Sequence, residues 1–497
     1  MSLMGIDIGS STCKAAVYAE HGVQLASGAA SYKVMKPEPG RFELDCVEVE
    51  QAVFSAIRQA ADVVRTSCND PITAISIGSF GEAVVPIDRN GTIIGNSIFS
   101  HDDRSKDAIA RLEQKGKDYF YRINANVLGY SYTYPKLVWY KEQVPELHAR
   151  IWKVLTWSDF IVYRLTGNAG TNFSLASRTL LFDVRKEQWS DELIEMGRVD
   201  KRILADVVPP GTVMGNIRRD MASMLHLDKD VTIVVGGHDQ CINALGAGAV
   251  DAGDSVTGIG TVECTTVVFD PLPDLDMLHS LNLGVEHHVV PGKYVAFIHN
   301  QAGALQTWFM HAFCTELQKE QPDERAILDL LTNEAPSSPT DLLFLPFVEP
   351  AGAPMFLPAN LGTYIGMGAT TGRGELYRAL LEGETFFFVQ AFEKLQQHGI
   401  KVKDIIATGG GSRSDVWLQI KADMFNRAVR RARYRESGTA GAAIAAGLST
   451  GVYDSVLQAV QAFKGSEQAF TPDHGHVQHY ERLYKKYQRA LEWISKD

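Results

Sequence analysis

Features that would point to a membrane, nucleic-acid-binding or secreted protein are missing from this chain of 497 residues. No apolar run approaches the roughly 20 residues that span a bilayer, and the first residues lack the basic and apolar regions of a signal peptide. The net charge is −11, from 48 basic and 59 acidic residues, and no long run of one sign occurs. We therefore expect a cytoplasmic protein with neither a nucleic-acid nor a membrane partner.

Cysteine is scarce and shows no CxxC spacing, with six residues at positions 13, 46, 68, 241, 264 and 314. A secreted disulfide framework or a thiolate metal site would need a closer pattern, so we expect reduced thiols. The motif GxxxxGK[ST] is also absent, which excludes a P-loop nucleotide site. A phosphate-bearing ligand would need backbone donors from another kind of loop.

The length of the chain predicts two domains, because one hydrophobic core stops growing at roughly 250 to 300 residues. The first half mixes strand and helix patterns, which makes it an α/β unit. In chain order we expect strands at 3–8, 14–19 and 23–32, a helix at 47–65, a strand at 72–77, a hairpin around 88–91, a helical stretch at 131–165, and a strand at 231–235 ending at 236–240.

The opening pattern returns in the second half, which predicts an internal duplication. Residues 255–261 again resemble a strand that runs into a glycine turn. We place the boundary near residue 248, giving domains of residues 1–247 and 248–497. Later segments of this half are predicted as a strand at 262–269, helices at 302–313 and 373–397, a strand at 404–408, and a small-residue helix at 437–447 that packs tightly against a neighbour.

Three glycine turns, at Gly9, Gly260 and 409–411, each follow a predicted strand. Such turns let backbone N–H groups approach phosphate oxygens that a Cβ atom would block. Each turn by itself is typical of any tight connection. Together, on two similar halves, they favour a nucleotide held between two domains.

Asp7 lies between two isoleucines near the end of the first predicted strand, where a charged side chain is unusual. A hydrated Mg²⁺ ion bound to nucleotide phosphates would explain it. The alternative is an Asx turn that closes the strand, and the local pattern leaves both interpretations open.

Asp239 also follows a strand, at a turn where it could accept the proton of an attacking hydroxyl during phosphoryl transfer. The alternative is a helix N-cap for the segment from Gln240 onward. His238 precedes it directly. Because neighbouring side chains on a turn usually point apart, we expect His238 to be structural.

Two longer segments carry a family resemblance. Residues 362–367 are Gly-Thr-Tyr-Ile-Gly-Met and, seven residues later, 375–382 are Glu-Leu-Tyr-Arg-Ala-Leu-Leu-Glu. They resemble, position by position, the C-terminal signature of the FGGY family of carbohydrate kinases, which includes xylulokinases, gluconokinases, glycerol kinases and autoinducer kinases. Residues 133–139 (Thr-Tyr-Pro-Lys-Leu-Val-Trp) resemble its other signature. The resemblance spans nearly the whole chain.

The resemblance implies a two-domain, duplicated actin-like ATPase (ribonuclease-H-like) α/β fold with ATP, Mg²⁺ and a sugar in the cleft between the domains. Asp239 matches the family's catalytic base, and Asp7 would hold the metal. The positions that match the family's phosphate and adenosine contacts are Ser10, Ser11, Thr12, Lys14, Gly260, Thr261, Gly303, Thr307, Gly410 and Gly411.

The substrate loop matches no subgroup of the family fully. Glycerol kinases and autoinducer kinases have Arg-Glu where this chain has Gly81 and Glu82, and xylulokinases have a histidine at the position of Glu82. Glu82 could accept hydrogen bonds from substrate hydroxyls, and an anionic substrate is disfavoured there. The resemblance implies substrate contacts from Gly81, Glu82, Asp102, Asp239 and Gln240.

We therefore expect ATP-dependent phosphorylation of a hydroxyl of a small sugar. The overall length and the segment 135–136 look most like those of xylulokinases, so the resemblance implies a ketopentose such as D-xylulose, giving xylulose 5-phosphate. One alternative is a kinase for glycerol, gluconate, ribulose, an autoinducer or a similar compound, and another is an actin-like ATPase that acts on protein. The C-terminal helical segment 479–494 is either a homodimer contact or a cover over the second domain.

Overall fold

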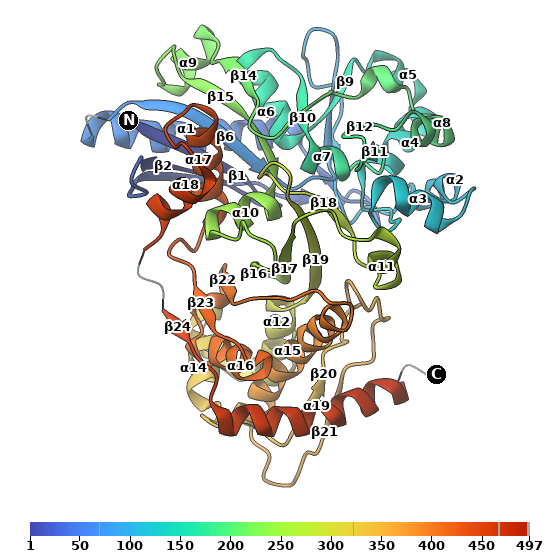
Figure 1. Cartoon of the computed structure of the whole chain (residues 1–497), viewed down its shortest axis with the longest axis vertical. Coiled ribbons are helices and arrows are strands. Elements are labelled where there is room, and N and C mark those ends of the chain that lie inside the picture. The colour runs from blue at the N-terminus through green and yellow to red at the C-terminus, as the bar shows by residue number, and fades with distance from the viewer. Residues whose placement is uncertain (69, 322, 466–467, 495–497) are drawn as a thin grey trace.

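The computed structural model describes residues 1–68, 70–321, 323–465 and 468–494 as two lobes, each built around one twisted sheet (Figure 1). The first sheet has the order β14-β15-β6-β1-β2-β3. Its strands β1, β2 and β3 are antiparallel, whereas β1, β6 and β15 are parallel. The bounds are β1 (Ser2–Ile8), β2 (Thr12–Ala19), β3 (Gln24–Ser31), β6 (Ile72–Ser79), β14 (Val213–Asn216) and β15 (Thr232–His238).

The second sheet repeats this topology in the order β18-β19-β17-β16-β22-β23-β24. Three antiparallel strands (β19, β17 and β16) again continue into parallel strands (β22 and β23), which confirms the predicted duplication. The bounds are β16 (Ser255–Ile259), β17 (Val262–Phe269), β18 (Val285–His287), β19 (Tyr294–Gln301), β22 (Ile405–Thr408), β23 (Val429–Arg431) and β24 (Ala469–Phe470).

Helices cover both faces of the first sheet, which explains why β1 is apolar on both sides. On one face lie α1 (Cys46–Ser67), which Asp45 caps through the backbone N–H groups of Val47 and Glu48, and α6 (Trp157–Thr166). On the other face lie α10 (Asp239–Ala247) and α17 (Ser437–Ser449). Buried apolar strands covered in this way are typical of α/β proteins.

The small-residue helix α17 packs tightly against α10, as its sequence predicted. A Cβ atom on Gly441 would lie 1.9 Å from the carbonyl oxygen of Ile242, and one on Gly246 would lie 1.9 Å from that of Ser437. No real side chain tolerates such contacts, so both positions require glycine. Although α17 and α18 (Val456–Phe463) follow residue 248, they lie beside the first sheet in Figure 1.

The second lobe is covered by α12 (Gly303–Phe313), α15 (Arg373–Gln397), α16 (Asp415–Phe425) and α19 (His474–Ile494). Helix α19 buries Tyr480 and Tyr487 against this lobe, and the Tyr480 hydroxyl donates to Glu382 at 2.8 Å. It therefore covers the second domain, one of its two predicted roles. Within the described residues, no helix combines the length and apolar character needed to cross a membrane.

Two local predictions were wrong in part. The chain does turn back at 88–91, where Ile94 N donates to the carbonyl oxygen of Pro86 at 3.1 Å and a bridge joins Ile87 to Ile93. However, the ladder partner of the strand β7 (Val84–Ile87) is β9 (Lys153–Thr156). Consequently the stretch 131–165 is not continuously helical, because β9 separates α5 (Pro145–Arg150) from α6.

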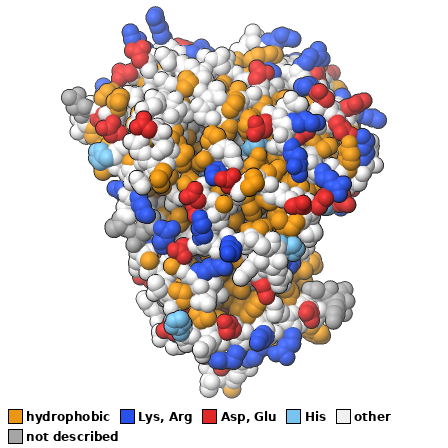
Figure 2. Space-filling model, in the orientation of Figure 1, with side chains coloured by type: hydrophobic (Ala, Val, Ile, Leu, Met, Phe, Trp, Pro, Cys, Tyr) orange, Lys and Arg blue, Asp and Glu red, His pale blue; other side chains and the backbone are white. Residues whose placement is uncertain are grey.

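On the face drawn in Figure 2, basic and acidic side chains are intermixed.

Candidate active site

The polar residues predicted for the first lobe meet at one edge of its sheet. In the register of the parallel strands, Ile8 lies beside Ser79, and Ser79 lies beside His238. Since the carboxyl ends of these strands coincide, Asp7 and Asp239 lie at the same edge. Burial raises the pKa of Asp7 to about 7, and the charge of Asp239 adds to this rise.

Asp7 also faces the beginning of α17. A Cβ atom on Gly438 would lie 2.5 Å from Asp7 Oδ2, so glycine there lets the helix backbone approach the carboxylate. Lys14 stands opposite Asp7 in the register of β1 and β2 and forms an ion pair with Glu436, in the segment just before α17. Ser10 and Ser11 are exposed in the turn between those strands, followed by half-buried Thr12.

The glycine turns of the second lobe come together in the same manner. The backbone N–H of Gly303 donates to the carbonyl oxygen of Gly260 at 3.0 Å, and a Cβ atom on Gly409 would lie 2.7 Å from the carbonyl oxygen of Ile259. Gly410 and Thr261 are exposed at this place. The structure thus groups the predicted nucleotide residues Gly260, Thr261, Gly303, Gly410 and Gly411, with Thr307 one helical turn beyond Gly303 on α12.

These turns fit a phosphate-bearing ligand. No atom lies within 4 Å of the position that a Cβ atom would take on Gly410, which leaves the backbone there open to a ligand. Metal binding fits Asp7 for a chemical reason, since a carboxylate oxygen is the ligand that Mg²⁺ prefers in proteins. ATP and Mg²⁺ are therefore both compatible with the residues present.

A cavity of about 470 Å³ lies between the lobes and is lined by both. Asp239, Gln240 and Glu82 contribute from the first lobe, and Cys264 and Phe297 from the second. Of the predicted substrate contacts, three therefore reach a common space.

A chain of buried ion pairs runs from Glu82 to Asp239. Arg178 Nε donates to Glu82 Oε1 at 2.9 Å, and the Arg178 guanidinium lies 3.6 Å from Glu286 Oε2. His238 Nδ1 forms a hydrogen bond of 2.6 Å with Glu286 Oε1. Finally, His238 Nε2 lies 3.2 Å from Asp239 Oδ1, so the expectation that these neighbours point apart was wrong.

The pKa values along this chain follow from burial and charge. Burial would raise the pKa of Glu82, but Arg178 and then His238 lower it to about 2. Burial raises the pKa of Asp239, while the neighbouring His238 opposes that rise. Burial would lower the pKa of His238, but Glu286 and Asp239 raise it above its ordinary value.

The alternative role of Asp239 as a helix N-cap does not match the geometry. The N-cap of α10 is His238, and Asp239 is the first helical residue. The Asp239 side chain is 26% exposed, against 6% for His238 and 0% for Glu286, so its carboxylate is the more accessible end of this chain. It is free to meet a ligand in the cavity.

Two predicted substrate residues lie off the cavity lining. A Cβ atom on Gly81 would lie 2.5 Å from Arg178 Cγ, so glycine makes room for the arginine. Asp102 has a fully buried side chain, whose oxygens accept from Arg104 at 2.7 and 2.8 Å and from the backbone N–H of Phe42 at 2.7 Å. The geometry does not favour Asp102 as an acceptor of substrate hydroxyls.

The sequence offered weak signals for the residues that it missed. Glu286 is a charged residue between Val285 and the valines at 289–290, in a strand-like stretch that also contains two histidines, and this could have indicated a special role. Arg178 lies in a short stretch without a pattern, 96 positions from its partner Glu82. Only the folding of the first lobe brings the two residues together.

Two similar lobes, with carboxylates at a sheet edge of one lobe and open glycine turns on the other, are the arrangement expected of a two-lobed kinase that acts on small molecules. The chain belongs to the FGGY family of carbohydrate kinases: the family's N-terminal domain matches residues 2–246, and its C-terminal domain matches residues 257–450. It is a sugar phosphotransferase.

Known proteins of the family are similar over almost their whole length. A xylulose kinase from Staphylococcus xylosus is 26% identical, with 98% of each chain covered. An autoinducer-2 kinase from Klebsiella pneumoniae is 27% identical, covering 98% of this chain and 93% of the relative. A solved structure described as a xyloylose kinase from Brucella ovis has the same fold, with a TM-score of 0.88, 22% identity and full coverage of both chains.

Proposed function

We propose that this protein transfers the γ-phosphoryl group of ATP to a hydroxyl of a ketopentose such as D-xylulose. The observation that carries the proposal is the partly exposed Asp239 carboxylate on the wall of the cavity between the lobes. The similarity to the xylulose kinase of Staphylococcus xylosus supports this sugar class.

In the proposed reaction, the oxygen of the substrate hydroxyl forms a bond to the γ-phosphorus, and Asp239 accepts the proton of that hydroxyl. The bond between the γ-phosphorus and the bridging oxygen breaks, and ADP leaves. Asp7 would hold the Mg²⁺ ion, which offsets phosphate charge when bound. Exposed backbone N–H groups of the turns at Ser10 and Gly410 would contact phosphate oxygens.

The charges at the cavity favour a neutral substrate. Arg178 is held between Glu82 and Glu286, so its charge is already neutralised. The Asp239 carboxylate of the lining remains able to accept hydrogen bonds that sugar hydroxyls donate. We place the sugar in this cavity and the nucleotide at the glycine turns. We also propose that the protein is cytoplasmic and that its two domains comprise residues 1–247 and 248–497.

The test is ADP release with Mg-ATP against D-xylulose, L-ribulose, D-gluconate, glycerol and erythritol. We expect strong stimulation by D-xylulose. Stimulation by another compound would keep the kinase and replace the substrate. Equal ADP release with and without every compound would contradict the proposal and favour an ATPase that acts on protein.

A further inference from the structure

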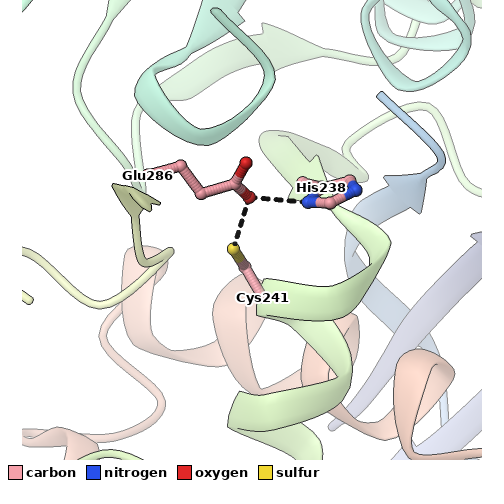
Figure 3. Close-up of side chains that lie close together, drawn as sticks. All are labelled: His238, Cys241 and Glu286. Carbon is pink, nitrogen blue, oxygen red and sulfur yellow. Dashed lines mark hydrogen bonds and ion pairs between the residues drawn. The ribbon is translucent and has the colours of Figure 1, made fainter. Parts of the chain in front are cut away.

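His238, Cys241 and Glu286 form a compact cluster (Figure 3). The cluster lies next to Asp239, because His238 Nε2 is 3.2 Å from Asp239 Oδ1. His238 ends β15 of the first sheet and Cys241 lies on α10, whereas Glu286 belongs to β18 of the second sheet. Glu286 Oε1 accepts from the Cys241 thiol at 3.1 Å and contacts His238 Nδ1 at 2.6 Å. The cluster therefore joins the two lobes directly beside the proposed base.

Both nitrogens of the His238 ring face a carboxylate. Nδ1 meets Glu286, and Nε2 lies 3.2 Å from Asp239 Oδ1. A neutral imidazole has only one N–H group, so it would leave one carboxylate facing a nitrogen lone pair. The doubly protonated ring donates to Glu286 through Nδ1 and places its positive charge 3.2 Å from Asp239 Oδ1 through Nε2. The other charged groups near it, Arg178 and Glu82, are paired with each other.

We propose that His238, doubly protonated and held by Glu286, is a positioning residue that keeps the Asp239 carboxylate ionised and oriented at the cavity wall. The inference rests on the proposed function, because it concerns the base of that reaction. It gives His238 a role in the reaction, whereas the sequence predicted a structural residue of the turn. A nearby positive charge favours the ionised form of a buried carboxyl group.

A metal ion is the competing interpretation of this cluster. The three ligand atoms lie within 4.8 Å of one another. However, the separation of 2.6 Å between His238 Nδ1 and Glu286 Oε1 is that of a short, charge-assisted hydrogen bond. Burial also raises the pKa of the Cys241 thiol well above its ordinary value, which keeps it protonated, whereas zinc binds the thiolate.

The first test compares the pH dependence of kcat/KM in the wild type, His238→Gln and Glu286→Gln. We expect both variants to lose turnover. The acidic limb of the profile should move to higher pH by at least about one unit, because the pKa of Asp239 rises without the neighbouring positive charge. The KM for ATP should stay within about twofold, because the cluster lies on the sugar side. The double variant should resemble either single variant, since both changes break one unit.

His288→Gln is the matched control. This neighbouring histidine is also buried, but its Nε2 contacts the backbone carbonyl of Ala249 and no carboxylate of the cluster. We expect its acidic limb to stay at the wild-type pH. Suppose that the wild-type protein phosphorylates the sugar and that folded His238→Gln shows an unshifted acidic limb. This result would overturn the inference and leave the proposed function standing.

The second test needs no activity and no variant at the catalytic step. Nitrogen-15 resonances of histidine in the wild-type protein report how many protons each ring carries. We expect the His238 ring to be doubly protonated at pH 7. A neutral ring, or an equimolar metal ion in purified protein that Cys241→Ser removes, would overturn the inference even if no sugar substrate were found.

Discussion

The Asp239 carboxylate is the residue on which the proposed chemistry depends. Asp239→Asn keeps the shape of the side chain but removes its capacity to accept a proton. We expect kcat to fall by about 10² to 10⁴-fold, measured as steady-state ADP release, while ATP still binds. Asp251→Asn, at an exposed position beyond α10, is the control and should keep normal turnover. Near-normal turnover in Asp239→Asn would contradict the assignment.

Glu82 makes the stability of the protein depend on pH. Its pKa falls from an ordinary 4.5 to about 2, which corresponds to roughly 3 kcal/mol. A lowered pKa contributes stability above the unfolded value and loses it as the pH falls. In Glu82→Gln we therefore expect unfolding free energy to be lower by about 3 kcal/mol at pH 7.

The difference between wild type and Glu82→Gln should shrink as the pH falls from 4.5 towards 2, because the wild-type carboxylate then becomes protonated. Denaturant unfolding at several pH values measures this. The exposed Glu146→Gln is the control and should match the wild type throughout. A difference that stays constant down to pH 2 would show that the charge of Glu82 is not the cause.

Asp7 is the residue through which Mg²⁺ should act. We expect Asp7→Asn to raise the half-saturating Mg²⁺ concentration by about tenfold or more, because a carboxylate ligand is lost. Titration of ADP release with Mg²⁺ at fixed ATP measures this. An unchanged Mg²⁺ dependence would contradict the metal assignment.

At the scale of elements, the crossing of α10 and α17 positions α10, whose first residue is the proposed base Asp239. Gly441→Ala would bring a Cβ atom to 1.9 Å from the carbonyl oxygen of Ile242, one turn after Asp239. We expect a loss of stability of about 1 to 3 kcal/mol or more, measured by thermal unfolding. Gly368→Ala, with nothing within 4 Å of the added atom, should change little. Equal effects of the two variants would contradict this account of the crossing.

At the scale of the whole molecule, the cavity is lined by both lobes. A sugar that contacts both lobes should favour a more closed arrangement, which also excludes water from the phosphoryl group. We expect the radius of gyration, measured by small-angle X-ray scattering, to fall when sugar and a non-hydrolysable ATP analogue bind together. An unchanged radius would contradict closure, and the analogue alone is the control.

Much of the fold was predicted from sequence where patterns are long and strong. The strand Val262–Phe269 and the helix Arg373–Gln397 have the predicted bounds. The helical stretch 131–165 failed at β9, because four residues are too short to show a strand period between two helices. The family signatures did not depend on such local periods.

The sequence by itself determined the family, the duplicated strand and glycine pattern, and the positions of Asp7 and Asp239 at strand ends. These features depend on neighbours close along the chain. Only the tertiary structure decided that Arg178 fills the space beside Gly81 and that Glu286 reaches His238 from 48 positions away. The reason is physical: buried charges acquire their partners when segments far apart in the sequence pack together, and no local pattern records that contact.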